Sequence, residues 1–295
     1  ITNNSINTQT IANNIVLASN SQWNTASGAV VYAGNLTGTN FTFTKSGTGK
    51  LTFTGVNEIK LAANGITGGG TLTIAGGVTT NVAAVFFFGT AGGNTLVVTN
   101  GATFACTNSV CTVDKTNTVV IAGAGTVWDG VDYPKLTVKS DSTFIVADGA
   151  VVTNIGQFNY GSGGRNSSII VTNGGRISAA EGSMYQGGNL HRLYIGGTNS
   201  AGIGSIMHFT NGFNLGSTYV CSSNTAIIDA DGTLYSGAGF TLGFGWNGTG
   251  VCNSIIVTNG GQFFTSGGTW GTRIGDDYSP DNWVWVGGTH PVTGL

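Results

Sequence analysis

Runs of alternating apolar residues that stop at a glycine recur along the chain. The clearest copy covers residues 254–263, S-I-I-V-T-N-G-G-Q-F, and similar text stands at 168–177, S-I-I-V-T-N-G-G-R-I, and at 95–104, T-L-V-V-T-N-G-A-T-F. In each copy a β-branched run ends at Asn-Gly, the pair that best accepts positive φ, and a second alternating run follows. The pattern predicts one strand, a tight corner and the next strand in every copy.

The glycines that end these runs are about two dozen residues apart. From Gly34 to Gly287 the successive intervals are 21, 21, 25, 22, 26, 25, 38, 20, 28 and 27 residues. A repeat of this length holds two or three short strands and no helical stretch, so it cannot bury its apolar side alone and neighbouring copies must stack. We therefore predict an all-β fold, a parallel β-helix (β-solenoid) of about 11 rungs with a period of about 20–28 residues. It forms a single domain over residues 1–295.

The repeated phrase assigns roles to its residues. The expected corner residues are Asn100, Gly101, Asn173, Gly174, Asn211, Gly212, Asn259 and Gly260. We expect the Asn side chains to hydrogen-bond backbone groups at these turns. Along the strands, stacking of like on like predicts an inward apolar ladder that contains Ile256, Ile170 and Leu96.

The longest interval, between Gly174 and Gly212, predicts an inserted loop at about residues 178–200. Its notable side chains are Glu181, Met184, Tyr185, His191 and Arg192. Insertions in solenoids map to the surface and often to a binding face, so this loop is the best candidate for a specific contact. A plain solvated loop is the alternative.

The composition is typical of extended β-structure, and it argues against nucleic acid and a membrane span. Only 7% of the 295 residues are charged and 51 are Gly, so Thr, Ser, Asn and Gly must cover the surface and helices should be nearly absent. The net charge is -2, and without a basic stripe nucleic acid is not an expected partner. No apolar run approaches the roughly 20 residues of a membrane span. The start at Ile1, without a leader, suggests a removed signal or a longer precursor.

The four cysteines come as two local pairs without metal-knuckle spacing. They are Cys106, Cys111, Cys221 and Cys252. If the protein is exported, disulfides are favoured over buried free thiols. Cys106 and Cys111 flank one short turn, and Cys221 and Cys252 fall near the same phase of adjacent rungs, where a rung-to-rung bridge is geometrically reasonable.

The first 80 or so residues resemble the autotransporter-associated β-strand repeat of exported bacterial proteins. The matching phrases are N-N-I-V-L at 13–17, Q-W-N at 22–24 and T-K-S-G-T-G-K-L-T-F-T-G-V-N at 44–57. Residues 1–92 carry rungs of this style, and residues 93–295 carry looser passenger-type rungs with the V-T-N-G-G corner. The resemblance implies a right-handed β-helix, export, and an extracellular or cell-surface role, with no catalytic residues or cofactors to transfer. The C-terminal membrane barrel of such proteins is absent from this sequence, and residues 58–61 depart from the family's usual Y-T-G-G-T.

Stacked β-helices also include polysaccharide lyases and hydrolases, which need converging carboxylates, with or without Ca²⁺. The densest acidic group is Asp276, Asp277 and Asp281, a weak candidate for a metal site or an acid–base pair, with an exposed turn as the simpler interpretation. Asp229 and Asp231 resemble the start of a calcium loop but lack its distal Glu, so a corner role explains them better. The three His residues, His191, His208 and His290, have no paired ligand spacing.

These observations favour a structural or adhesive role over catalysis. We expect end-to-end self-association through segments near 1–17 and 283–295, because unpaired end rungs offer a template for strand addition. Surface glycans are a further possible partner. The alternatives are a carbohydrate-active β-helix that uses the acidic group or the loop around His191, and a glycan-binding module that uses exposed aromatics such as Trp246, Trp270 and Trp283.

Overall fold

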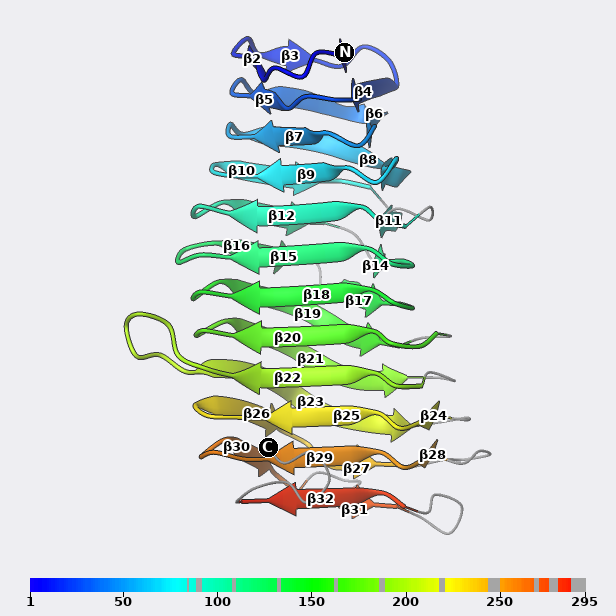
Figure 1. Ribbon diagram of the computed structural model, residues 1–295, viewed down its shortest axis with the longest axis vertical. Coiled ribbons are helices and arrows are strands. Elements are labelled where there is room, and N and C mark those ends of the chain that lie inside the picture. Colours follow the sequence, from blue (N-terminus) through cyan, green and yellow to red (C-terminus); the bar gives the residue numbers. More distant parts are fainter. Residues whose placement is uncertain are drawn as a thin grey trace.

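Parallel strands stack coil upon coil along one axis in the computed structural model of this protein (Figure 1). The structure describes residues 1–83, 85–88, 92–107, 110–131, 134–161, 164–185, 189–217, 221–243, 250–267, 271–275 and 281–287. Within these ranges every regular element is a strand, and no helix is present that could cross a membrane. The predicted all-β parallel solenoid is therefore confirmed.

One face of the solenoid is a sheet with one strand from each coil, and it is called the front sheet because it faces the reader in Figure 1. Its twelve strands in the described residues are β2 (Gln9–Ile11), β5 (Val30–Tyr32), β7 (Lys50–Phe53), β9 (Thr71–Ile74), β12 (Thr95–Thr99), β15 (Thr118–Ala122), β18 (Thr143–Ala147), β20 (Ser168–Thr172), β22 (Arg192–Gly196), β25 (Thr225–Ile228), β29 (Ser254–Val257) and β32 (Trp283–Val286). At about 4.8 Å per strand the sheet is roughly 53 Å long. The number of coils thus differs slightly from the predicted eleven.

The rest of each coil supplies two further faces that join into an eighteen-stranded sheet. The face that follows the corner contains β3 (Ile15–Val16), β10 (Val78–Asn81), β13 (Thr103–Cys106), β16 (Val127–Gly130), β26 (Gly232–Ser236) and β30 (Gln262–Thr265). The next face contains β1 (Thr2–Asn3), β4 (Ser21–Thr25), β11 (Val85–Phe88), β14 (Val110–Val113), β17 (Lys135–Val138), β27 (Phe240–Leu242) and β31 (Thr272–Ile274). Long strands run through both faces and join them: β6 (Leu36–Ser46), β8 (Asn57–Ile66), β19 (Val151–Tyr160), β21 (Arg176–Tyr185) and β23 (Ser205–Ser217). A small separate sheet pairs β24 (Cys221–Ser222) with β28 (Gly250–Val251).

The coil is right-handed, as parallel strands joined by crossovers almost always are. In Figure 1 the front strands run from right to left, the chain returns behind them, and each circuit lies one level further down. A clockwise path that recedes from an observer at the N-terminal end is a right-handed helix.

Inward side chains form columns that continue from coil to coil. On the front sheet Leu96, Val119, Phe144 and Ile169 occupy successive levels of one column, and all four are fully buried. One continuous cluster of buried apolar residues extends from Leu17 to Val257, through the change of sequence style near residue 92. Because each coil packs only on its neighbours, the core is a long, narrow strip.

The predicted inward ladder of Ile256, Ile170 and Leu96 is wrong by one residue. Ile170 stands in register with Val97, and Ile256 lies further along that same column, whereas Leu96 is level with Ile169. Successive side chains of a strand point to opposite faces, so Ile170 faces outward while Leu96 faces the core. Ile170 is only partly buried, as an outward residue should be.

The predicted inserted loop at 178–200 is also corrected. Residues 178–185 belong to β21, and 192–196 form β22. The chain leaves the stack at 197–204 instead, between β22 and β23, as the loop that projects at the left of Figure 1. This insertion lengthens the coil: the chain advances 21 residues from Val30 to its partner Leu51, but 33 from Arg192 to Thr225.

Candidate functional site

Asn-Gly corners connect the front sheet to the following face. At Asn100–Gly101 the φ angles are 56° and 71°, and the Ala102 N–H donates to the Thr99 carbonyl over 3.1 Å. Positive φ at both central residues is the type I′ turn, which Asn and Gly adopt at the least cost. The pairs Asn173–Gly174 and Asn259–Gly260 form the same turn.

Asn211–Gly212 does not form such a corner, contrary to the prediction. Both residues lie inside β23, where Gly212 pairs with Glu181 of β21 next to a register shift. The turn of this coil is replaced by the 197–204 loop. An Asn-Gly pair in the sequence therefore marked a bend between two faces of the long sheet and not the end of a front strand.

Corner amides bond to carboxylates of the preceding coil, whereas backbone bonds had been expected. Asn173 Nδ2 donates to Asp148 Oδ1 over 3.1 Å, and Asn259 Nδ2 donates to Asp229 Oδ1 over 2.8 Å. Burial opposes ionisation of Asp229, but hydrogen bonds from Ala230 N–H, the Asn259 amide and the Tyr194 hydroxyl outweigh it, so the pKa of Asp229 is lowered. These Asp side chains serve the corner, which agrees with the simpler interpretation of the 229–231 segment.

A polar column that the sequence analysis missed stands one residue before each front strand from β12 to β32. This entry ladder consists of Asn94, Asn117, Ser142, Ser167, His191, Asn224, Asn253 and Asn282. At most levels the backbone N–H of one coil donates to the side chain of the next, as from Asn94 N to Asn117 Oδ1 at 2.9 Å and from Asn253 N to Asn282 Oδ1 at 3.0 Å. At the Ser142 level the N–H donates instead to the Lys139 carbonyl of its own coil. The signal was available, because an Asn precedes the β-branched run at residues 94, 117, 224, 253 and 282.

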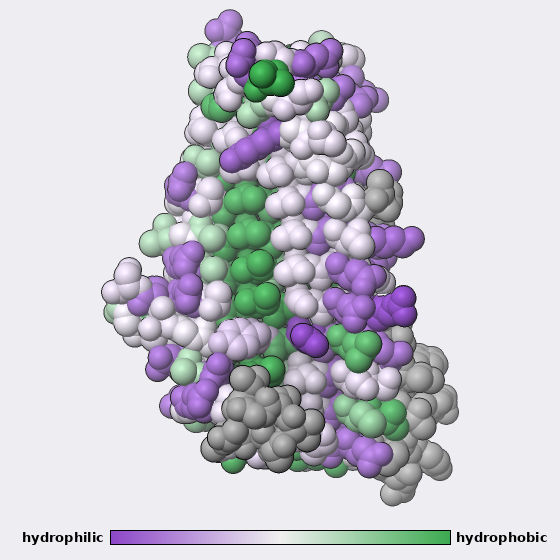
Figure 2. Space-filling model, in the orientation of Figure 1, coloured by the Kyte–Doolittle hydropathy of each residue, from purple (hydrophilic) through white to green (hydrophobic). Residues whose placement is uncertain are grey.

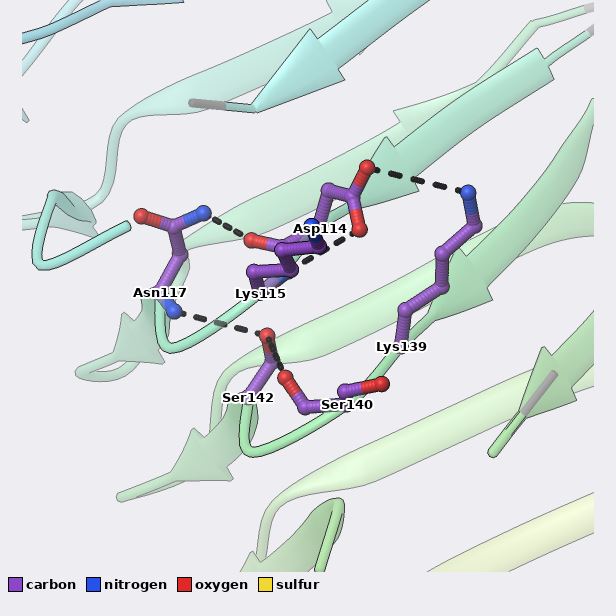
Figure 3. A network of polar contacts seen from close by, with 6 residues as sticks. All are labelled: Asp114, Lys115, Asn117, Lys139, Ser140 and Ser142. Atoms are coloured by element: carbon purple, nitrogen blue, oxygen red, sulfur yellow. Dashed lines mark hydrogen bonds and ion pairs between the residues drawn. The ribbon is translucent and has the colours of Figure 1, made fainter. Parts of the chain in front are cut away.

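Figure 3 shows how the ladder is tied to the surface. Asn117 N–H donates to Ser142 Oγ at 3.4 Å, and the Asn117 amide donates to the Asp114 carbonyl. The Asp114 carboxylate lies 3.7 Å from Lys139 Nζ. Both ends of this ion pair are partly exposed, so it contributes little, while the buried amide bonds fix the turn.

His191 is a rung of the entry ladder and not a loop residue. Its side chain is 1% exposed, its Nδ1 accepts from Ser167 N–H at 3.0 Å, and its backbone N–H donates to Asn224 Oδ1. Burial lowers the pKa of His191 to about 4, so the ring is neutral at pH 7. A neutral imidazole whose Nδ1 accepts from the backbone is a structural spacer with no free nitrogen turned to solvent.

Gly49 and Gly70 take the entry position before β7 and β9, and the side chain of a buried lysine fills the space beside Gly70. A Cβ at Gly70 would lie 1.7 Å from Lys45 Nζ, which donates to the Gly47 carbonyl. The Lys45 side chain is fully buried, and burial lowers its pKa to about 8. The change in sequence pattern near residue 92 is thus a change from glycine and Lys45 to a column of Asn, Ser and His side chains.

The 197–204 loop folds on itself. Asn199 N–H donates to the Ile203 carbonyl over 3.0 Å, and its Oδ1 accepts from the N–H groups of Ala201 and Ile203. The residues expected to make it a contact site belong to neighbouring strands: Glu181, Met184 and Tyr185 are in β21, and Arg192 is an exposed residue of β22. The side chains of Met184 and Tyr185 lie outside the described set.

The acidic candidates are only partly described. Asp276 and Asp277 lie outside the described residues, and Asp281 is exposed at a turn with φ of 62°. Among the described residues no three His, Cys, Asp or Glu side chains come together as a metal site would require. His290, Trp246 and Trp270 fall outside the described ranges as well. Trp283 is 38% exposed, at the start of β32.

The described cysteines are free thiols, contrary to the disulfide interpretation. Cys106 and Cys111 are buried side by side, and burial together with a hydrogen bond to Cys111 raises the pKa of the Cys106 thiol. Cys252 is exposed and free, two residues past Gly250, the partner of Cys221. Nothing is described of the Cys221 side chain.

The inward columns are open at both ends of the described stack. Ile11 and Ile15, in the first coils, are only partly buried although their partners Tyr32 and Leu36 are fully buried. At the other end Val286 is 73% exposed, although its partner Val257 in the coil above is buried. Core side chains that meet solvent at an end of a solenoid are available to a further coil.

Comparison with family models, with curated proteins and with solved structures finds no match to this chain.

Proposed function

We propose that this chain is a structural solenoid of the cell exterior, a subunit or segment of a surface fibre, sheath or adhesin stalk that stacks end to end. The observation that carries the proposal is the open core at both ends. Ile274 of β31 is 53% exposed, yet it continues the column of Leu242, which is fully buried. A coil placed below it would bury this surface.

The geometry of the ends suits another solenoid. Each terminal coil presents the edge of a parallel sheet together with open apolar columns. A second copy offers strands of the same direction and the same spacing of about 4.8 Å, so hydrogen bonds and columns continue without a change of register. Stacking by strand addition therefore lengthens the rod and leaves its cross-section unchanged.

The charge of the chain is compatible with stacking, and the N-terminal resemblance supports a placement outside the cell. The chain has 12 acidic and 10 basic residues and a net charge of -2, so a long rod of it carries little self-repulsion. The N-terminal phrases that resemble autotransporter-associated repeats imply export. Adhesion to surface glycans would then be a property of the exposed faces.

Electron micrographs and light scattering of the purified chain test the proposal. We expect particles longer than one solenoid, growing with concentration, and rods of uniform width. Replacing Ile274 and Val286 by Lys places charge on the open columns and should reduce the particles to short units. Val78→Lys is the matched control, since Val78 is exposed on β10 away from the ends. Single solenoids at high concentration, without fibres, would contradict the proposal.

A further inference from the structure

The loop at 197–204 leaves the stack and turns back along the edge of earlier coils. Figure 1 shows it rising from the level of β22 past the corner that follows β20, and in Figure 2 the same loop is the protrusion at the left of the rod. Thr198 and Gly204 pair across it as an antiparallel bridge, and Asn199 Oδ1 accepts from two backbone N–H groups within it. The loop is therefore a closed hairpin.

The hairpin contacts the corner glycine of the preceding coil, Gly174. The Gly174 N–H donates at 3.0 Å to the hydroxyl of Ser205, the first residue after the loop. A Cβ on Gly174 would lie 2.8 Å from the Ile203 carbonyl oxygen and 2.9 Å from Asn199 Cβ. The loop therefore lies directly against this corner and fills the space that a side chain there would need.

Other corners of the same type are uncovered. Gly101 and Gly260 follow Asn in the same turn, and a Cβ on either would meet no atom within 4 Å. Both of these glycines are exposed, whereas Gly174 is buried. The burial of Gly174 is thus caused by the loop and not by the turn itself.

The hairpin also contacts a corner two coils away. Gly149 follows β18, and a Cβ on it would lie 3.3 Å from Asn199 Nδ2, so the Asn199 amide lies over this glycine. Asn199 is partly buried, although its neighbours Thr198 and Ser200 are exposed. Strands two levels apart are separated by about 9.6 Å, and coils of a solenoid contact only their neighbours. The loop therefore joins the β22 coil to the β18 coil across the coil between them.

We propose that residues 197–204 are a clamp that halts unfolding of the solenoid from its C-terminal end at the β22 level. Where coils contact only their neighbours, unfolding that begins at an end proceeds one coil at a time. The β22 coil differs from the coils after it, because its separation from the stack also breaks the contacts of the loop with Gly174 and Gly149. Its opening should therefore be less frequent than that of the β25 and β29 coils.

Hydrogen exchange of the native protein tests the clamp strand by strand. Single solenoids of the Ile274→Lys/Val286→Lys chain keep the measurement independent of end-to-end stacking. We expect a step in protection, with the amides of β25 and β29 exchanging faster than those of β22. Asn199→Ala should speed exchange in β22 about tenfold, since it removes the acceptor of two N–H groups and the contact with Gly149, and should leave β25 and β29 unchanged. Ser200→Ala, at the exposed neighbouring position, is the matched control.

A second variant approaches the clamp from the corner. Gly174→Ala needs the space of the Ile203 carbonyl and should displace the loop, whereas Gly101→Ala has the same positive φ and meets no atom. Gly174→Ala should therefore speed exchange in β22 more than Gly101→Ala does. This excess should disappear in the Asn199→Ala background, where the clamp is already open.

Three results would overturn the clamp. They are equal exchange in β22 and β25 of the parent chain, equal effects of Asn199→Ala and Ser200→Ala on β22, and an excess for Gly174→Ala that persists in the Asn199→Ala background. Circular dichroism checks that every variant keeps its β-structure, as changes outside the stack should allow. None of these results depends on whether solenoids stack end to end.

Discussion

Replacing His191 by Asn should reduce the loss of folding stability at acid pH while keeping the hydrogen bonds of the entry ladder. Asn is the residue that the ladder uses above and below, at 117 and 224, and its Oδ1 can accept from Ser167 N–H as His191 Nδ1 does. The variant therefore changes the titratable group and conserves the bond. It leaves a gap beside Tyr160, whose ring centroid lies 6.4 Å from that of His191.

The magnitude follows from the lowered pKa. His191 has an ordinary pKa of 6.5 and a folded-state pKa of about 4, lowered chiefly by burial. At about 1.4 kcal/mol per whole step of pKa, this gap of about 2.5 corresponds to roughly 3 kcal/mol. A proton on Nδ1 would also face the Ser167 N–H, so the hydrogen bond is lost when the ring charges.

Because the folded-state pKa of His191 is lowered, its contribution to the free energy of unfolding is lost on acidification. Between pH 6.5 and pH 4 the unfolded chain binds a proton at His191 that the folded chain does not, so the free energy of unfolding falls as the pH falls. Above pH 6.5 the contribution is constant, and below pH 4 the loss is complete. Wild type should therefore lose about 3 kcal/mol more than His191→Asn between pH 7 and pH 4.

Urea unfolding curves at a series of pH values measure this difference, and the imidazole proton signals give the pKa of His191 directly. His208→Asn is the matched control, because His208 faces outward and packs edge-on against Tyr235 at 5.6 Å. Equal losses for wild type and His191→Asn, or a folded-state pKa of His191 near 6.5, would refute the reasoning.

Three further predictions test the ladder, the corners and the thiols. Asn253→Ala leaves the N–H and the amide of Asn224 without their shared acceptor and should lower the free energy of unfolding by about 1–3 kcal/mol. Gln157→Ala removes only an exposed bond to Glu181 and should change it by less than about 0.5 kcal/mol. Urea titration compares the two, and equal effects would contradict the role of the ladder. Gly101→Ala meets no atom within 4 Å and should cost only the left-handed strain of about 1–2 kcal/mol, while a Cβ at Gly49 would lie 2.5 Å from the Gly28 carbonyl oxygen, so Gly49→Ala should lower the melting temperature much more; a smaller drop for Gly49→Ala would be contrary to the structure. Cys106 and Cys111 should resist thiol reagents in the native protein and react on unfolding, with Cys252 as the exposed control; rapid labelling of Cys106 in the native state would count against its burial.

The solenoid could be predicted from the sequence because the glycines that end its strands recur at intervals of about two dozen residues. The direction of each side chain could not. In S-I-I-V-T both Ile169 and Ile170 are apolar and β-branched, so the pattern of apolar and polar residues does not show which of the two faces the core. A shift of one residue exchanges the two faces. Only the register of neighbouring coils shows that Ile169 joins the Leu96 column and that Ile170 faces outward.

Site residues were harder to predict, for a related reason. Asn-Gly at 173–174 and at 211–212 look alike, but only the first forms a corner, because the second coil makes its turn through the 197–204 loop. The turn-forming tendency of a residue pair is local, whereas the level at which a coil turns is set by stacking. His191 likewise resembled a loop residue until its place above Asn224 showed that it is a rung.

The entry ladder gives the rod a direction. Its backbone bonds between coils all run the same way, from an N–H of one coil to a side chain of the following coil, as from Asn94 to Asn117 and from Asn224 to Asn253. Removing the C-terminal coil leaves a backbone N–H of the coil before it without its acceptor, and the backbone holds that N–H in place. Removing the N-terminal coil instead leaves a side-chain oxygen without its donor, and that side chain can turn into water. Removing end coils one at a time from the N-terminal end should therefore require a different force from removing them from the C-terminal end.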